Sequence, residues 1–322
     1  MFLFSLAIIV GLVFLVLSAD RFVAGSAAIA NNFGVPHIII GVTIVSLGTS
    51  APEIIAAIIA SLNGKTELAM GNAIGSNIAN IGLVLGITAL VAPIPISKRL
   101  ITNENLIMLA VAALAGLLLF NLYLGFIESL LLVAVLIAFL AWIYIQHTST
   151  EQPEADEFEE DIPSDMATWK AILWFVVGLA VLIASARLLL WGAIGIADQY
   201  GISEAIIGAT IIAVGTSLPE LAASVASALK KHHDIAIGNI LGSNIFNILA
   251  VLAVPGLVAP GSFGSQVFDL HYLFMMGISL LLFTMLFVQG KRNANLGRYI
   301  GTIFVLVYAA YGYLNYQAVV TL

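Results

Sequence analysis

Residues 41–53 read GVTIVSLGTSAPE, and residues 208–220 read GATIIAVGTSLPE, at an offset of 167 residues. The same offset relates GNAIGSNIAN at 71–80 to GNILGSNIFN at 238–247. Eight of 13 positions are identical in the first pair and seven of 10 in the second, and most of these are Gly, Ser, Thr, Asn, Pro and Glu. Packing alone would favour retention of apolar residues instead. We therefore expect the duplicated polar residues to share a task in an internally repeated chain.

The rest of the chain is strongly apolar. Of its 322 residues, 61% are hydrophobic and 9% are charged, and the mean hydropathy is +1.10. Ordinary soluble domains carry roughly 25% charged residues. The apolar runs are about 20 residues long, which is the length of a transmembrane helix. The sequence thus predicts an all-α integral membrane protein. Its lack of cysteine excludes disulfides, thiolate metal sites and cysteine nucleophiles.

Ten candidate membrane spans set the predicted organisation. They lie near residues 2–20, 36–62, 66–92, 103–121, 124–146, 169–191, 203–229, 234–260, 268–288 and 297–316. This pattern predicts a first five-helix repeat at 1–146, an acidic linker at 147–168 and a second five-helix repeat at 169–322. Because five is an odd number of spans, the second repeat must enter the membrane from the opposite side. The duplication is therefore predicted to be an inverted repeat.

Basic residues predict the orientation of the chain. An outside N-terminus places nine Lys and Arg residues inside and only Lys65 and Arg187 outside, as the positive-inside rule favours. Eight of the 18 acidic residues lie between Glu151 and Asp165, a composition typical of a solvated linker. We expect a multi-pass protein of the inner (plasma) membrane, with both termini outside and the linker in the cytoplasm.

Two glutamates, Glu53 and Glu220, fall in the middle of predicted spans. An ionised carboxylate near the bilayer centre costs several kcal/mol, so each should face the bundle interior and have a partner. Arg187 is the only basic residue well inside a span, and one arginine cannot serve both halves. A bound cation or a proton is the remaining compensation.

Oxygen donors accompany both glutamates at helical spacing. The residues on the same helix face are Thr49 and Ser46 for Glu53, and Thr216 and Ala213 for Glu220. Pro52 and Pro219 leave backbone carbonyls without a donor, so we expect both helices to unwind there. Carboxylates, hydroxyls and free carbonyls form an all-oxygen cage, which suits Ca²⁺ and Na⁺ rather than zinc or copper.

The next span of each half carries a second polar stripe. Its members recur every fourth residue and so share a helix face: Asn72, Ser76 and Asn80, then Asn239, Ser243 and Asn247. Small-xxx-small pairs should let a neighbouring backbone approach closely; they are Gly71 with Gly75 and Gly238 with Gly242. Two structural interpretations stay open. Ser50 and Ser217 could form capping boxes with the glutamates, and the asparagines could serve as interhelical hydrogen-bonding residues.

GTSAPE and GTSLPE, each followed by GNxxGSNxxN, resemble the two alpha-repeats of the sodium/calcium exchanger family, in the cation/calcium antiporter superfamily. The resemblance, closest to compact prokaryotic members, spans essentially the whole chain. It implies ten helices, with the second, third, seventh and eighth in a central core and the first and sixth moving against it. It also implies a set of ion ligands. For Ca²⁺ the implied ligands are Glu53 and Glu220, with oxygens from Thr49 and Thr216. For Na⁺ they are Ser76 and Ser243, with the backbone at Ser46 and Ala213. Asn80 and Asn247 match the remaining central position. Some members carry an aspartate at the position of Asn247.

The predicted function is secondary antiport of Ca²⁺ against Na⁺ by alternating access. Ca²⁺/H⁺ antiport through the same cage and K⁺-dependent Na⁺/Ca²⁺ exchange remain alternatives. An intramembrane hydrolase is not expected, because the chain has no HExxH, no cysteine and no duplicated histidine, and a channel is less expected than an antiporter. The expected partners are Ca²⁺, Na⁺ and the lipid bilayer. We expect no enzyme activity, no cofactor, no nucleic acid and no protein partner.

Overall fold

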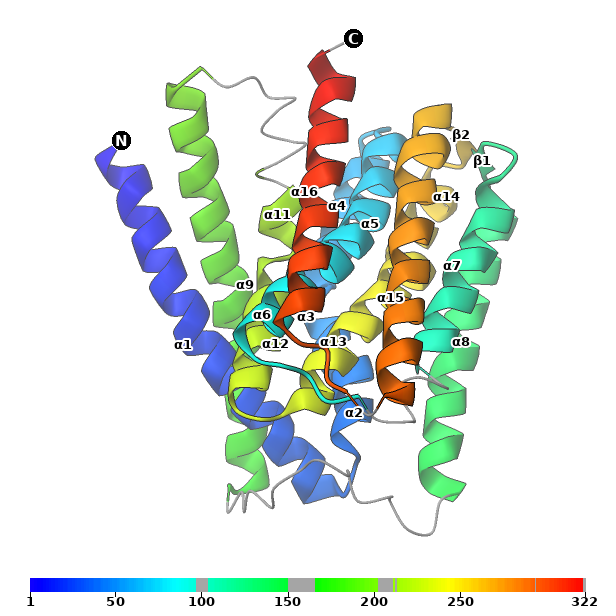
Figure 1. Cartoon of the computed structure of the whole chain (residues 1–322). Coiled ribbons are helices and arrows are strands. Elements are labelled where there is room, and N and C mark those ends of the chain that lie inside the picture. The colour runs from blue at the N-terminus through cyan, green and yellow to red at the C-terminus, as the bar shows by residue number, and fades with distance from the viewer. Residues whose placement is uncertain (97–103, 150–165, 202–210, 212, 293, 321–322) are drawn as a thin grey trace.

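A computed structural model describes residues 1–96, 104–149, 166–201, 211, 213–292 and 294–320, and nearly all of these are helical (Figure 1). Within the described residues, six helical segments are long and apolar enough to cross a membrane, or seven if one bent pair is counted. The six are Phe2–Phe33, Thr66–Val91, Phe126–Ile145, Thr168–Gln199, His233–Val258 and Val267–Lys291. The protein is therefore a multi-pass helical membrane protein, as the sequence predicted.

The helices of the core spans occur in the same order in the two halves. The first half contains α1 (Phe2–Phe33), α2 (His37–Ile40), the π-helix η1 (Gly41–Val45), α3 (Ser46–Thr49), α4 (Ala51–Leu62), α5 (Thr66–Ala79), the π-helix η2 (Asn80–Leu85), α6 (Gly86–Val91), α7 (Asn105–Leu119), β1 (Tyr123–Leu124) and α8 (Phe126–Ser149). The second half contains α9 (Thr168–Gln199), α11 (Ala213–Thr216), α12 (Leu218–Leu229), α13 (His233–Phe246), the π-helix η5 (Asn247–Val251), α14 (Ala253–Val258), β2 (Gly261–Ser262), the π-helix η6 (Val267–Tyr272), α15 (Leu273–Lys291) and α16 (Arg298–Val320). Four pairs of helices, α3 with α11, α4 with α12, α5 with α13 and α6 with α14, keep the 167-residue offset at both ends. The sequence repeat is thus also a repeat of structure.

Helices α1 and α9 pack against each other along their length in opposite directions. A Cβ atom added to Gly25 would lie 2.6 Å from the amide nitrogen of Phe175, and one added to Gly192 would lie 2.7 Å from the carbonyl oxygen of Phe4. Near its C-terminal end, α1 thus meets the start of α9, and its N-terminal end meets the last part of α9. Small residues matter here because apolar burial gives little driving force between helices in lipid, so close backbone packing must supply it.

The centre of the molecule is formed by the third span of each half. In the segments Thr66–Val91 and His233–Val258, 72% and 83% of the most apolar window is buried, against 28% in α1 and 22% in α9. Glycines allow this density on α13, where a Cβ atom on Gly242 would lie 2.5 Å from the Ser46 hydroxyl oxygen. Among the described residues, added Cβ atoms on Gly71 and Gly75 would meet nothing within 4 Å. The repeat places the expected neighbours of Gly71 and Gly75 in segment 202–210, which lies outside the described residues.

The second span is bent by 41° between His37–Thr49 and Ala51–Leu62, at Ser50. Ser217 separates α11 from α12 at the equivalent place, and Pro52 and Pro219 lie in the first turns of α4 and α12, where a missing N–H is tolerated. The sequence correctly predicted an interruption here. It did not predict the π-helical segments, of which η2 begins at Asn80 and η5 at Asn247.

Short strands join loops of the two halves. Tyr123 and Leu124 of β1 pair with Ser262 and Gly261 of β2, and Ile94 forms an isolated bridge with Leu296. Both termini lie at one end of the bundle, whereas α8 ends and α9 begins at the other end (Figure 1). The acidic segment predicted between those two helices falls mostly on residues 150–165, outside the described part of the chain.

Candidate ion-binding site

Glu53 and Glu220 are buried at equivalent positions, each 1% exposed and each in the first turn after a break in its helix. Helix N-termini favour anions, because unpaired N–H groups and the helix dipole point toward them. Neither carboxyl oxygen of Glu53 has a hydrogen-bond partner among the described residues, and Oε2 of Glu220 also lacks one. Three of four carboxyl oxygens are therefore buried without a donor from the residues that the structure describes, an arrangement that calls for a ligand.

Ser50 connects the two halves at this point. Its hydroxyl donates to Oε1 of Glu220 at 3.3 Å, across 170 positions of sequence. Neither Ser50 nor Ser217 makes a side-chain hydrogen bond that caps the helix after it. The capping-box interpretation is therefore wrong in both halves. Ser50 bonds the glutamate of the opposite half, and the Ser217 hydroxyl has no partner among the described residues.

A second contact between the halves runs through Thr49. The Thr49 hydroxyl donates to Oδ1 of Asn239 at 3.0 Å and lies 3.4 Å from the hydroxyl oxygen of Ser243. The amide nitrogen of Asn239 in turn donates to the Ser224 hydroxyl at 2.9 Å and to the backbone carbonyl of Glu220 at 3.4 Å. Predicted site residues of α3, α12 and α13 thus form one buried polar cluster.

The other predicted site residues of the first half are buried nearby or on neighbouring helices. The Ser46 hydroxyl donates to the carbonyl of Val42 at 2.6 Å, and the Ser46 carbonyl accepts from Thr49 at 3.3 Å. Ser76 and Asn80 are 3% and 0% exposed, and their side-chain polar atoms have no hydrogen-bond partner in the described structure. The structure therefore buries them as predicted but shows no bond from them to either glutamate.

In the second half, Asn247 is fully buried, and neither atom of its side-chain amide is hydrogen-bonded within the described residues. Thr216 is half-buried on α11. Ala213 is the first residue of α11, so its backbone starts the same short helix.

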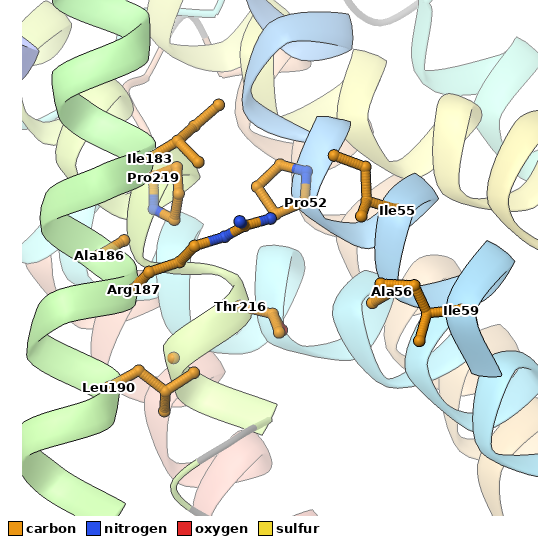
Figure 2. Close-up of a pocket in the computed structure, with 11 residues that line it drawn as sticks. Pro52, Ile55, Ala56, Ile59, Ile183, Ala186, Arg187, Leu190, Thr216 and Pro219 are labelled. Atoms are coloured by element: carbon orange, nitrogen blue, oxygen red, sulfur yellow. The ribbon is translucent and has the colours of Figure 1, made fainter.

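A pocket of about 280 Å³ opens beside this cluster, between α9 and the breaks in the two core helices. Pro52, Gly215, Thr216 and Pro219 form part of its wall, and Arg187 extends into it from α9 (Figure 2). Helix α1, which lies beside α9, packs against α12, and Lys230 Nζ lies 2.6 Å from Asp20 Oδ1. The two helices therefore have different surroundings: a pocket separates part of α9 from α4, whereas α1 packs directly on α12.

The side chains around the two glutamates offer mainly oxygen atoms in the described part of the chain. No group of three or more His, Cys, Asp or Glu side chains is placed to hold a metal there. Two carboxylates with hydroxyls, amides and carbonyls instead form a hard, all-oxygen environment of the type that binds Ca²⁺ and Na⁺.

The ion ligands predicted from the sequence omit three contributors to the cluster: Ser50, Asn239 and Ser224. For two of them a signal was present, because Ser50 and Asn239 belong to the duplicated motifs and have counterparts at Ser217 and Asn72. Ser224 has no such signal, since its counterpart is Ala57. Its partnership with Asn239 is visible only in three dimensions.

Comparisons with known proteins agree with this geometry. A sequence model described as "Sodium/calcium exchanger protein" matches residues 3–145 and 170–317. The putative antiporter CaxA of Alkalimonas amylolytica is 42% identical over 98% of this chain and 99% of its own length. The sodium/calcium exchanger MaX1 of Methanosarcina acetivorans is 31% identical over 95% of this chain and 96% of its length. The solved structure of the sodium-calcium exchanger NCX_Mj soaked with Na⁺ and Sr²⁺ is similar with a TM-score of 0.81, at 32% identity over 96% of this chain and 97% of that one. The chain therefore belongs to the sodium/calcium exchanger family, which consists of cation antiporters rather than enzymes.

Proposed function

We propose that this protein exchanges Ca²⁺ for Na⁺ across the membrane by alternating access, at the buried site between α3, α4, α12 and α13. The observation that carries the proposal is the pair Glu53 and Glu220, two buried carboxyl groups at equivalent breaks. Three of their four oxygens have no hydrogen-bond donor in the described part of the chain. The names of similar proteins, among them the sodium/calcium exchanger MaX1, support the choice of ions.

The proposed roles of the site residues follow the donor chemistry. Glu53 and Glu220 hold Ca²⁺, with oxygens from Thr49 and Thr216. Ser76, Ser243 and the backbone at Ser46 and Ala213 contribute to flanking Na⁺ positions, and the central amides belong to Asn80 and Asn247. No cofactor is needed, because both ions are transported substrates.

Neutralisation of the two carboxylates couples the transport of Ca²⁺ to that of Na⁺. Two carboxylates neutralise one Ca²⁺, and Na⁺ ions use overlapping oxygens, so the two ion sets exclude each other. A neutralised site can cross between outward-open and inward-open states. An empty site leaves two bare charges buried, and the penalty for that opposes crossing.

We infer two inverted repeats of five spans, an arrangement that suits this mechanism. Four pairs of helices that share the 167-residue offset, and the opposite directions of α1 and α9, support the inference. The pocket beside α9 and the packed contact between α1 and α12 fit one end state of an alternation in which these two helices move against the core. We place the protein in the inner (plasma) membrane, with both termini outside and the acidic segment in the cytoplasm, since basic residues gather on that side.

The test is ⁴⁵Ca²⁺ uptake into Na⁺-loaded proteoliposomes after dilution into Na⁺-free buffer. We expect uptake that needs the outward Na⁺ gradient and is lost, by roughly 100-fold or more, in Glu53→Gln and Glu220→Gln, since each leaves one carboxylate to balance a divalent ion. Glu67→Gln is the matched control, because Glu67 is an exposed acid at the start of α5.

Other outcomes would redirect the proposal. Uptake driven by a pH gradient without Na⁺ would mean Ca²⁺/H⁺ antiport, and uptake that requires K⁺ together with Na⁺ would mean K⁺-dependent exchange. Robust Na⁺-driven uptake by Glu53→Gln protein would contradict the assignment of the site.

A further inference from the structure

Arg187 is a basic side chain inside a membrane-spanning helix. It is the 20th residue of the 32-residue helix α9, and Figure 2 shows it reaching across the pocket toward Pro52. It forms no hydrogen bond or ion pair with any residue that the structure describes. A charged side chain at membrane depth is costly to keep, so one without a counter-ion calls for a functional explanation.

The pocket places this charge beside the proposed site. Its wall includes Pro52 and Pro219, each directly followed in sequence by one of the two buried glutamates. Thr216, a proposed Ca²⁺ ligand, lines the same pocket. A cation that moves between the pocket and the glutamates therefore passes close to the Arg187 guanidinium.

We propose that Arg187 is a specificity-determining residue, whose fixed positive charge lowers the affinity of the site for cations and does so more for Ca²⁺ than for Na⁺. This inference rests on the proposed exchange function and deepens it. The electrostatic work between the guanidinium and a bound ion is proportional to the ion's charge. If the arginine lowers the binding constant of one Na⁺ by a given factor, it therefore lowers the binding constant of Ca²⁺ by the square of that factor.

A charge that weakens substrate binding is useful on the side where the substrate is released. In the proposed orientation the pocket beside Arg187 opens outward, so the guanidinium promotes loss of Ca²⁺ to the outside. The arginine would thus lower the affinity of the outward-facing site for Ca²⁺ and speed the release of Ca²⁺ on that side.

The 167-residue offset pairs Arg187 with Asp20, and the arginine next to Asp20 has a different setting. Arg21 is the 20th residue of the 32-residue helix α1, but its guanidinium carbon lies 4.5 Å from the centroid of the Trp174 ring, to which Lys170 Nζ is also near at 5.0 Å. It lines a different pocket, between α1 and α9. Arg21 therefore provides a matched control: an arginine near the equivalent place in α1 that does not line the pocket at the glutamates.

The test measures equilibrium binding to purified protein in detergent, with ⁴⁵Ca²⁺ dialysis for Ca²⁺ and displacement of ⁴⁵Ca²⁺ for Na⁺. For Arg187→Gln we expect about threefold tighter Na⁺ binding per ion and about tenfold tighter Ca²⁺ binding at low ionic strength, with smaller changes in a high concentration of an inert salt. Arg187→Lys should stay close to wild type because it retains the charge, and Arg21→Gln should also match wild type. In proteoliposomes, the Arg187→Gln change should appear mainly in KM for Ca²⁺ rather than in kcat.

The outcomes separate this inference from the proposed function. Unchanged Ca²⁺ affinity in correctly folded Arg187→Gln protein, or equal shifts for Ca²⁺ and Na⁺, would overturn the inference. So would Arg187→Lys behaving like Arg187→Gln, since shape rather than charge would then matter. Tighter Ca²⁺ binding by Arg187→Gln together with no Na⁺-driven transport by wild type would keep the role of Arg187 and refute the exchange function.

Discussion

His232 shows how one buried residue outside the spans can couple folding to pH. It lies in the turn between α12 and α13, is 8% exposed and stacks on His37 with ring centroids 5.6 Å apart. Burial, and after it the positive charge that His37 and Lys230 can carry, lowers the pKa of His232 from 6.5 to about 4. In the unfolded chain His232 therefore binds a proton near pH 6.5, whereas in the folded chain it binds one only near pH 4. Stability is unaffected above this window and falls as the pH drops through it.

We predict that His232→Gln makes the protein less sensitive to acid. At pH 5 the protonation difference at His232 costs the folded wild type about 2 kcal/mol, which corresponds to a shift of a few degrees in a protein of this size. The measurement is the thermal unfolding midpoint in detergent at pH 7.5 and pH 5, with the variant's midpoint at pH 7.5 as the check on its fold. Equal decreases in wild type and variant would show that His232 contributes nothing to the acid sensitivity.

Single residues also show where sequence reasoning ends. Periodicity predicted that Thr49 and Ser46 share a face with Glu53, and the structure buries all three in one region. The same reasoning offered Ser50 as a cap for its own helix, whereas its hydroxyl bonds Glu220. Spacing along one helix specifies neighbours within that helix. It does not specify which residue 170 positions away competes for the same hydroxyl.

For the helices, the duplication in the sequence predicted more of the structure than composition did. The 167-residue offset correctly paired α4 with α12 and α5 with α13, and Pro52 and Pro219 correctly marked the breaks that precede them. The π-helical segments η2 and η5 could not be predicted, because one extra residue per turn leaves no signature in hydrophobic periodicity. Such segments often occur at functional sites.

Helix α13 packs closely on the second span at Gly242. A Cβ atom on Gly242 would collide with the Val42 carbonyl oxygen and come within 2.5 Å of the Ser46 hydroxyl oxygen, so Gly242→Ala should push α3 away from α13. We expect a loss of about 1–3 kcal/mol in folding free energy, as for other overpacked interiors. We also expect at least tenfold slower exchange, because Thr49 would no longer meet Asn239 and Ser243.

Gly277→Ala on α15 is the control for that substitution, since an added Cβ atom there meets nothing within 4 Å among the described residues. Unfolding midpoints and ⁴⁵Ca²⁺ uptake should be measured for both variants. If Gly242→Ala exchanges ions as fast as Gly277→Ala, close approach of these backbones is not required for the site.

At the scale of the whole molecule, the sequence predicted a repeated, membrane-spanning architecture but not the difference between its halves. Equivalent helices have different surroundings: α9 borders a pocket at the core, while α1 is held to α12 beside the contact between Asp20 and Lys230. One sequence must encode both end states of a transporter. The state that is populated depends on small differences in packing and ion occupancy, and a motif does not record these.

Cross-linking can show whether α1 leaves the core during transport while α1 and α9 stay together. The chain contains no cysteine, so pairs can be introduced without background thiols. A reversible thiosulfonate cross-linker joining Asp20→Cys to Lys230→Cys should stop exchange, because it holds α1 on α12, and reduction should restore it. The same reagent across Asn32→Cys and Thr168→Cys, where the amide nitrogen of Asn32 lies 3.3 Å from the Thr168 hydroxyl oxygen, joins α1 to α9 and should leave the rate within about twofold of wild type. Full exchange with the first tether in place would mean that α1 does not part from α12. Loss of exchange with the second tether would mean that α1 and α9 move separately, even though their glycines bring the two backbones into contact.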